Sequence, residues 1–98
     1  MKIKVQSIHF TADKKLLQFV EEKVDKLFLF YDQIIDSEVF LRLDKSETAE
    51  NKIAEIKIYT PGKILFAKEQ CKTFEEATDV AVEAVLRQIE KHKDKQRQ

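Results

Sequence analysis

The sequence predicts a single α+β domain over residues 1–98, with the element order β-α-β-β-β-α. Four short segments alternate between apolar and polar residues, as half-buried strands do, and two longer segments repeat apolar residues at helical spacing. A Pro-Gly pair between two of the strand segments predicts a tight hairpin. We therefore expect a four-stranded mixed sheet with both helices packed on one face.

The first strand is predicted at residues 2–8, and the first helix is predicted between Thr11 and Tyr31. Thr11 is the expected N-cap of this helix, because a threonine side chain can accept a hydrogen bond from a free backbone N–H at a helix start. The apolar residues of the helix fall on one face at Leu16, Val20, Val24, Leu27 and Tyr31. A helical crossover of this kind makes the first two strands parallel.

Three further strands are predicted at residues 38–43, 54–59 and 64–69. A polar loop over residues 44–52 separates the first two of these. Between the last two strands, the run from Thr60 to Lys63 has Pro61 and Gly62 at the positions that a type II turn favours. The predicted hairpin makes these strands antiparallel.

The last helix is predicted to begin at a capping box, in which Thr73 is followed three residues later by Glu76. Its core stripe consists of Phe74, Ala77, Ala81, Val85 and Ile89. Residues 73–84 carry only acidic charges, whereas residues 85–98 carry five basic against two acidic side chains. This polarity stabilises the helix through its dipole, and it also suggests a basic end that docks on a polyanion.

Composition excludes several classes of function. The chain is neutral overall, so any anion-binding surface must be a local patch. The one cysteine, Cys71, permits no internal disulfide and suits a reducing compartment; a small, partly apolar residue at a strand end explains it better than a reactive thiol does. We expect no metal site, because His9 and His92 have no partner at ligand spacing. We also expect no small-molecule substrate. No catalytic constellation is visible, and we expect no membrane span and no signal peptide.

Basic residues line one flank of each predicted helix. In the first helix they alternate with aromatic residues, at Lys15, Phe19, Lys23, Lys26 and Phe30. Lysines that neutralise phosphates and rings that stack on bases suit a nucleic-acid surface, although solvated lysines beside a core edge give the same pattern. In the last helix Arg87, Lys91 and Lys95 form a second ridge. Because the two helices should lie parallel, both basic flanks are expected on one side of the domain.

These residues also carry a resemblance to a known family. The segments concerned are Phe19-Val20-x-x-Lys23-x-x-Lys26-Leu27, Tyr31-Asp32-x-Ile34 and Arg87-Gln88-x-x-Lys91-His92-Lys93-Asp94-Lys95. They resemble the ribosome hibernation promoting factors, also called ribosome-associated inhibitor A or protein Y, in their short form. The resemblance covers essentially the whole chain and implies a fold like that of double-stranded-RNA-binding domains.

The resemblance implies a cytoplasmic, bacterial stress-response protein that is not an enzyme and uses no cofactor. Such proteins bind the small ribosomal subunit in its decoding channel and block the sites of messenger and transfer RNA. The residues that would contact ribosomal RNA phosphates are Lys23, Lys26, Arg87, Lys91, Lys93 and Lys95.

The chain departs from the family pattern at positions where relatives often have basic residues, namely Leu17, Gln33 and Ala84. Apolar residues replace polar ones at Phe28 and Leu29, and Leu29 should point to solvent. The alternative function is therefore a small interaction module that self-associates through an apolar helix edge of Leu17, Phe28 and Leu29, without RNA.

Overall fold

The computed structural model describes residues 3–45 and 49–96, with the side chains beyond Asp94 outside the described part. Its elements occur in the predicted order β-α-β-β-β-α. They are β1 (Ile3–Ile8), α1 (Lys14–Phe30), β2 (Asp36–Leu43), β3 (Lys52–Thr60), β4 (Lys63–Cys71) and α2 (Phe74–Gln96). The strands extend one or two residues beyond most of the predicted limits, because the backbone pairing continues past the clear alternation.

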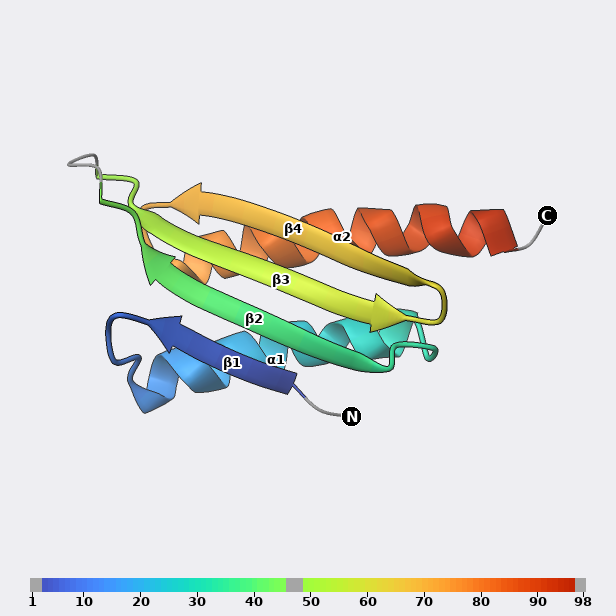
Figure 1. The fold of residues 1–98 in the computed structure, drawn as a ribbon, viewed down its shortest axis with the longest axis horizontal. Helices are drawn as coiled ribbons and strands as arrows, with labels where there is room; N and C mark the ends of the chain where they lie inside the picture. The colour runs from blue at the N-terminus through green and yellow to red at the C-terminus, as the bar shows by residue number, and fades with distance from the viewer. Residues whose placement is uncertain (1–2, 46–48, 97–98) are drawn as a thin grey trace.

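The four strands form one sheet in the order β1-β2-β3-β4. β1 and β2 are parallel, as predicted from the helical crossover, and the other neighbouring pairs are antiparallel. One row across the sheet joins Val5, Val39, Ile56 and Ala67. Both helices lie on the same face of this sheet and run alongside each other, so the opposite face carries no helix (Figure 1).

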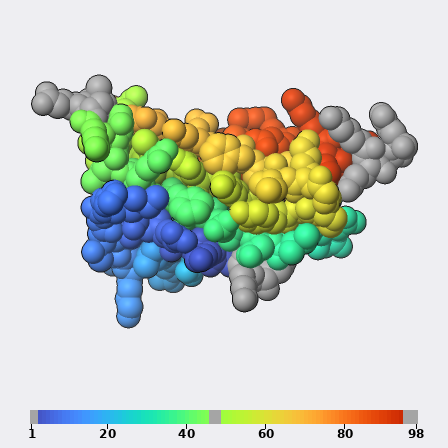
Figure 2. All heavy atoms as spheres, viewed as in Figure 1, coloured from blue at the N-terminus to red at the C-terminus, as the bar shows by residue number. Residues whose placement is uncertain are grey.

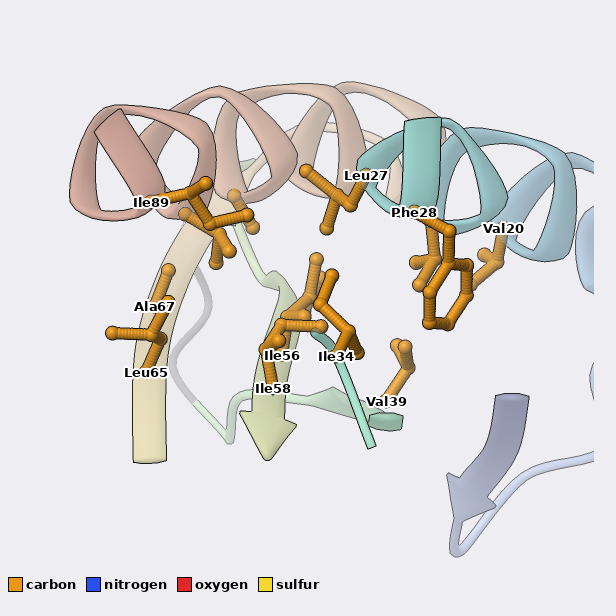
Figure 3. Packing of buried hydrophobic residues seen from close by; sticks show 14 of the residues in the cluster. Val20, Leu27, Phe28, Ile34, Val39, Ile56, Ile58, Leu65, Ala67 and Ile89 are labelled. Carbon is orange, nitrogen blue, oxygen red and sulfur yellow. The ribbon is translucent and has the colours of Figure 1, made fainter. Parts of the chain in front are cut away.

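The core lies between the helices and the covered face of the sheet (Figure 3). The predicted helical phases are confirmed, because Val20 and Val24 of α1 and Ala81, Val85 and Ile89 of α2 are all 0% exposed. Their partners on the strands are Val39, Leu41, Ala54, Ile56, Ile58 and Leu65, each at most 1% exposed. Burial of this apolar surface is the main stabilising contribution to the fold.

The two helix starts differ in how well the sequence predicted them. At α2 the backbone N–H of Glu76 donates to Thr73 Oγ1 at 3.0 Å, which confirms Thr73 as the capping residue. At α1 the prediction of Thr11 was wrong, because the N-cap is Asp13, whose Oδ1 accepts from the N–H of Leu16 at 2.8 Å. The first helical residue is Lys14, so a cap at Thr11 would lie two residues too early.

The β3–β4 hairpin has the predicted turn chemistry. Gly62 has a φ of 77°, the left-handed conformation that the third position of a type II turn requires and that glycine adopts without strain. The Thr60 hydroxyl donates to the carbonyl oxygen of Lys63 at 2.8 Å and closes the turn.

The apolar edge expected on α1 is not a single surface. Leu29 is 84% exposed, as predicted, but Phe28 is only 7% exposed and belongs to the core. Leu17 is half-buried. The expectation of an edge made by Leu17, Phe28 and Leu29 was therefore wrong. The side chains of Leu27 and Phe28 both pack in the core, and only that of Leu29 points to solvent.

Candidate nucleic-acid interface

The two flanks of α1 face different neighbours. On one flank Glu21, Glu22 and Asp25 line a shallow hollow together with Ile3 of β1. On the other flank the side chain of Lys23 reaches α2. Of the basic and aromatic residues predicted to share this flank, Lys23 thus contacts the second helix through its side chain.

Lys23 is held in an ion pair between the helices. Its Nζ lies 3.0 Å from Asp79 Oδ1, and 5.4 Å from the ring centroid of Phe19. The two charged side chains are 31% and 49% exposed, so solvent screening keeps this pair at the order of 1 kcal/mol or less. The predicted phosphate-binding lysine therefore already has an anionic partner in the free protein.

Lys93 is also engaged with the other helix. Its Nζ donates to the carbonyl oxygen of Phe30 at 3.0 Å, at the last residue of α1. The final carbonyls of a helix have no partner within the helix, and a cation is favoured there by the dipole. The neighbouring His92 packs edge-on against Tyr31, with ring centroids 5.7 Å apart. This part of α2 therefore fixes the end of α1.

Lys91 lies on a different flank of α2 from Asp79, and Arg87 is exposed one turn before Lys91. Gln88 identifies this flank, because its side-chain amide bonds both the N–H and the carbonyl of Phe66 in β4, at 3.3 and 2.7 Å. Lys91 is three residues further along and shares this side of the helix. Lys95 continues the same spacing within α2, but its side chain lies outside the described residues.

Both helices lie on the same face of the sheet, but their basic residues differ in their neighbours (Figure 1). Lys23 pairs with Asp79 on the side of α2 that faces α1, whereas Lys91 lies on the side of α2 from which Gln88 reaches β4. Lys26, Arg87 and Lys91 are exposed, and none of the three forms an ion pair with any residue that the structure describes. We call these three residues the exposed helix cations.

Asp79 and Gln88 connect α2 to α1 and to β4, but the sequence contains no indication of these contacts. Asp79 belongs to the acidic first half of α2, which the helix dipole explained sufficiently. Gln88 is a polar residue next to a core stripe. Neither the contact with Lys23 nor that with Phe66 is local in sequence, so no short-range pattern could have predicted them.

Cys71 does not have the environment of a reactive thiol. Burial raises its pKa, and the charges of Glu76, Glu69 and Glu50 raise it further. A nucleophilic cysteine instead needs a lowered pKa, because the thiolate is the reactive form. Within residues 3–45 and 49–96, His, Cys, Asp and Glu side chains form no group of three that could hold a metal ion. In the same ranges, no helix has the length and apolar character needed to cross a membrane.

The chain matches a family model described as sigma 54 modulation protein and S30EA ribosomal protein, over residues 3–97. It belongs to this family. The match covers almost the whole sequence, so both helices and all four strands of the described fold lie within it.

Two solved structures are similar to this member of the S30EA family. One is a ribosomal subunit interface protein from Coxiella burnetii, with a TM-score of 0.85 and 18% sequence identity, covering 96% of this chain and 99% of that one. The other is the N-terminal domain of Protein Y from Thermus thermophilus, with a TM-score of 0.75 and 22% identity, covering 93% and 94%. They confirm the predicted fold class.

Proposed function

We propose that this S30EA family member is a translation inhibitor that binds the small ribosomal subunit and blocks the sites of messenger and transfer RNA. The family match over residues 3–97 carries this proposal. One of the similar structures is named as a ribosomal subunit interface protein. The protein would act in the cytoplasm by occupying space, without catalysing a reaction.

The exposed helix cations are the first candidates for contact with ribosomal RNA. Lys26, Arg87 and Lys91 are solvated and have no carboxylate partner among the described residues, so they can neutralise phosphates without losing an existing contact. Lys23 and Lys93 have partners within the protein, and would bind phosphate only by sharing or leaving them. Lys95 remains a candidate because of its spacing.

Co-sedimentation with purified small subunits tests this proposal. We expect the variant Lys26→Glu/Arg87→Glu/Lys91→Glu to lose binding while its circular dichroism stays native, because exposed charge changes rarely unfold a domain. The matched control is Lys14→Glu/Lys63→Glu/Lys72→Glu, which changes the net charge equally at other exposed positions. Equal binding by the two triple variants would remove the helix cations from the proposal.

The salt dependence of inhibition gives a second test. Inhibition of translation in vitro should saturate near one protein per ribosome and should weaken as salt rises. About five phosphate contacts imply a log–log slope on the order of −3 to −4, because each contact releases counterions. The ribosomal RNA should remain intact throughout.

The alternative function, self-association without RNA, retains one supporting observation. Leu29 and Phe30 are 84% and 53% exposed at the end of α1, although Phe28 is buried. Apolar association does not weaken as salt rises. A flat salt response, together with dimers that Leu29→Ser/Phe30→Ser abolishes, would favour this alternative.

A further inference from the structure

The face of the sheet opposite the helices is open to solvent and forms the surface toward the viewer in Figure 2. The strand registers place its outward side chains in rows. One row joins Lys4, Glu38, Lys57 and Phe66, and the next joins Gln6, Phe40, Glu55 and Lys68. These residues alternate with the buried ones and therefore contribute little to the core.

Two phenylalanine rings lie on this face with lysines beside them. Phe66 is 42% exposed and Phe40 is half-buried. Lys57 is directly opposite Phe66 across the β3–β4 pair, and its Nζ lies 5.9 Å from the ring centroid of Phe40. Lys68 is in the same row as Phe40. We call Phe40, Lys57, Phe66 and Lys68 the ring–lysine patch.

The carboxylates beside the patch are already bonded to neighbours on the same face. Glu38 accepts a hydrogen bond from the Tyr59 hydroxyl, which raises the pKa of that phenol. Glu55 forms an ion pair with Arg42. Lys57 and Lys68 have no carboxylate partner among the described residues. Glu38 keeps its negative charge when it accepts from a neutral phenol, and it lies directly opposite Lys57, whereas Arg42 compensates the charge of Glu55. The lysines of the two rows, Lys4, Lys57 and Lys68, then face one uncompensated carboxylate, so the net charge at this patch is positive.

A hollow of about 650 Å³ continues the patch toward the end of β2. Lys68, Arg42 and Lys45 are among the residues that line it, and the one carboxylate in the lining, that of Asp44, accepts from the Gln70 amide at 3.0 Å. A volume in the range of about 300–1,000 Å³ is typical of small-ligand sites and accommodates a nucleotide. The patch and the hollow share Lys68, so they form one continuous surface.

We propose that this open face binds single-stranded RNA, with bases stacked on Phe40 and Phe66 and phosphates neutralised by Lys57 and Lys68. Every base has a flat π face, so such a surface tolerates many sequences. Bases of a duplex are paired and unavailable for this stacking. A protein partner would favour a continuous apolar patch, whereas lysines separate the rings here. This site lies on the other side of the sheet from the helix cations and goes beyond the proposed function.

Binding of a fluorescently labelled, unstructured 12-nucleotide RNA to the isolated protein tests this inference. We expect Phe40→Leu/Phe66→Leu to weaken binding by about tenfold or more per ring, because leucine keeps apolar bulk but cannot stack. The chain contains no tryptophan. Phe66→Trp should therefore retain binding and provide a single tryptophan, which can be excited apart from the two tyrosines and whose fluorescence stacked bases quench. The control Ile64→Ala removes an exposed apolar side chain from the same strand and should bind like the wild type.

Several results separate this inference from the proposed function. Lys57→Gln/Lys68→Gln should reduce the salt slope for the oligonucleotide by roughly 1.4, about 0.7 per lost phosphate contact. Phe40→Leu/Phe66→Leu should still sediment with small subunits, and the triple helix-cation variant should still bind the oligonucleotide. No binding of the oligonucleotide by the wild type, or equal binding by the leucine variant, would overturn the inference. A wild type that instead self-associates through the rings would assign this face to protein contact.

Discussion

Ile56 and Lys57 are neighbours in β3, yet their side chains lie on opposite faces of the sheet. Ile56 is 0% exposed beneath the helices, whereas the Lys57 amine lies over the Phe40 ring on the open face. Residues one position apart in the same strand therefore have different surroundings: one is packed in the core and the other is in contact with solvent. On the covered face a side chain contributes to stability mainly through burial. On the open face its contribution depends on the charge or ring of its cross-strand neighbour.

The largest expected effect is that of a charge introduced on the side of α2 that packs against the covered face of the sheet. Val85→Asp would place an unpaired carboxylate at a position that is 0% exposed. The cost of several kcal/mol consumes much of the roughly 5–15 kcal/mol that stabilises a domain of this size. Circular dichroism at 25 °C should show an unfolded or non-cooperative protein, whereas Lys91→Asp on the exposed side of the same helix should fold. A cooperative, native-like Val85→Asp would contradict the packing of α2.

Truncating an isoleucine on each face gives the next largest difference. Ile56→Ala should reduce the free energy of unfolding by about 2–5 kcal/mol, because it leaves a cavity in the core. Ile64 is 56% exposed, and Ile64→Ala should cost less than about 1 kcal/mol. Urea denaturation of both variants measures the two values. Similar losses at the two positions would show that the open face is packed against something in solution.

Thr78 within α2 and Thr73, which precedes its first residue, should respond to substitution by valine with opposite signs. Thr78 is 0% exposed and its hydroxyl has no hydrogen-bond partner among the described residues, so Thr78→Val should stabilise the protein by about 1 kcal/mol. Thr73 caps the helix, and Thr73→Val should destabilise it by about 1 kcal/mol. Thermal unfolding should shift upward in the first variant and downward in the second. A destabilised Thr78→Val would mean that the buried hydroxyl does have a partner.

The smallest expected effect is that of the ion pair between the helices. A double-mutant cycle with Lys23→Ala and Asp79→Ala should give a coupling free energy of about 0.2–1 kcal/mol at low salt, because both side chains are partly exposed. The coupling should vanish near 1 M salt, where charges are screened. A parallel cycle with Lys26→Ala should show no coupling to Asp79. Coupling to Lys26 would indicate that the helix cations share a mobile network of charges.

Features that depend on a few neighbouring residues were predictable from the sequence, whereas contacts between distant residues were not. The core stripes of both helices, the Thr73 cap and the Gly62 turn were predicted correctly, because spacing and backbone conformation determine them within a few residues. The α1 cap was misplaced, since Thr11 and Asp13 are both good caps and only the helix start distinguishes them. The roles of Lys93 and Gln88 were not predictable, because their partners lie 63 and 22 residues away.

The sequence by itself determined the element order, the covered face of the sheet and the family of this protein. Periodic burial of apolar residues is a local property of the chain, and it requires no knowledge of which elements meet. Only the tertiary structure decided which charges are free. Asp79 neutralises Lys23, and the carbonyl of Phe30 binds Lys93, while Lys26, Arg87 and Lys91 have no carboxylate partner among the described residues. A cation is available for an anionic ligand only when packing brings no partner to it, and packing depends on the whole fold.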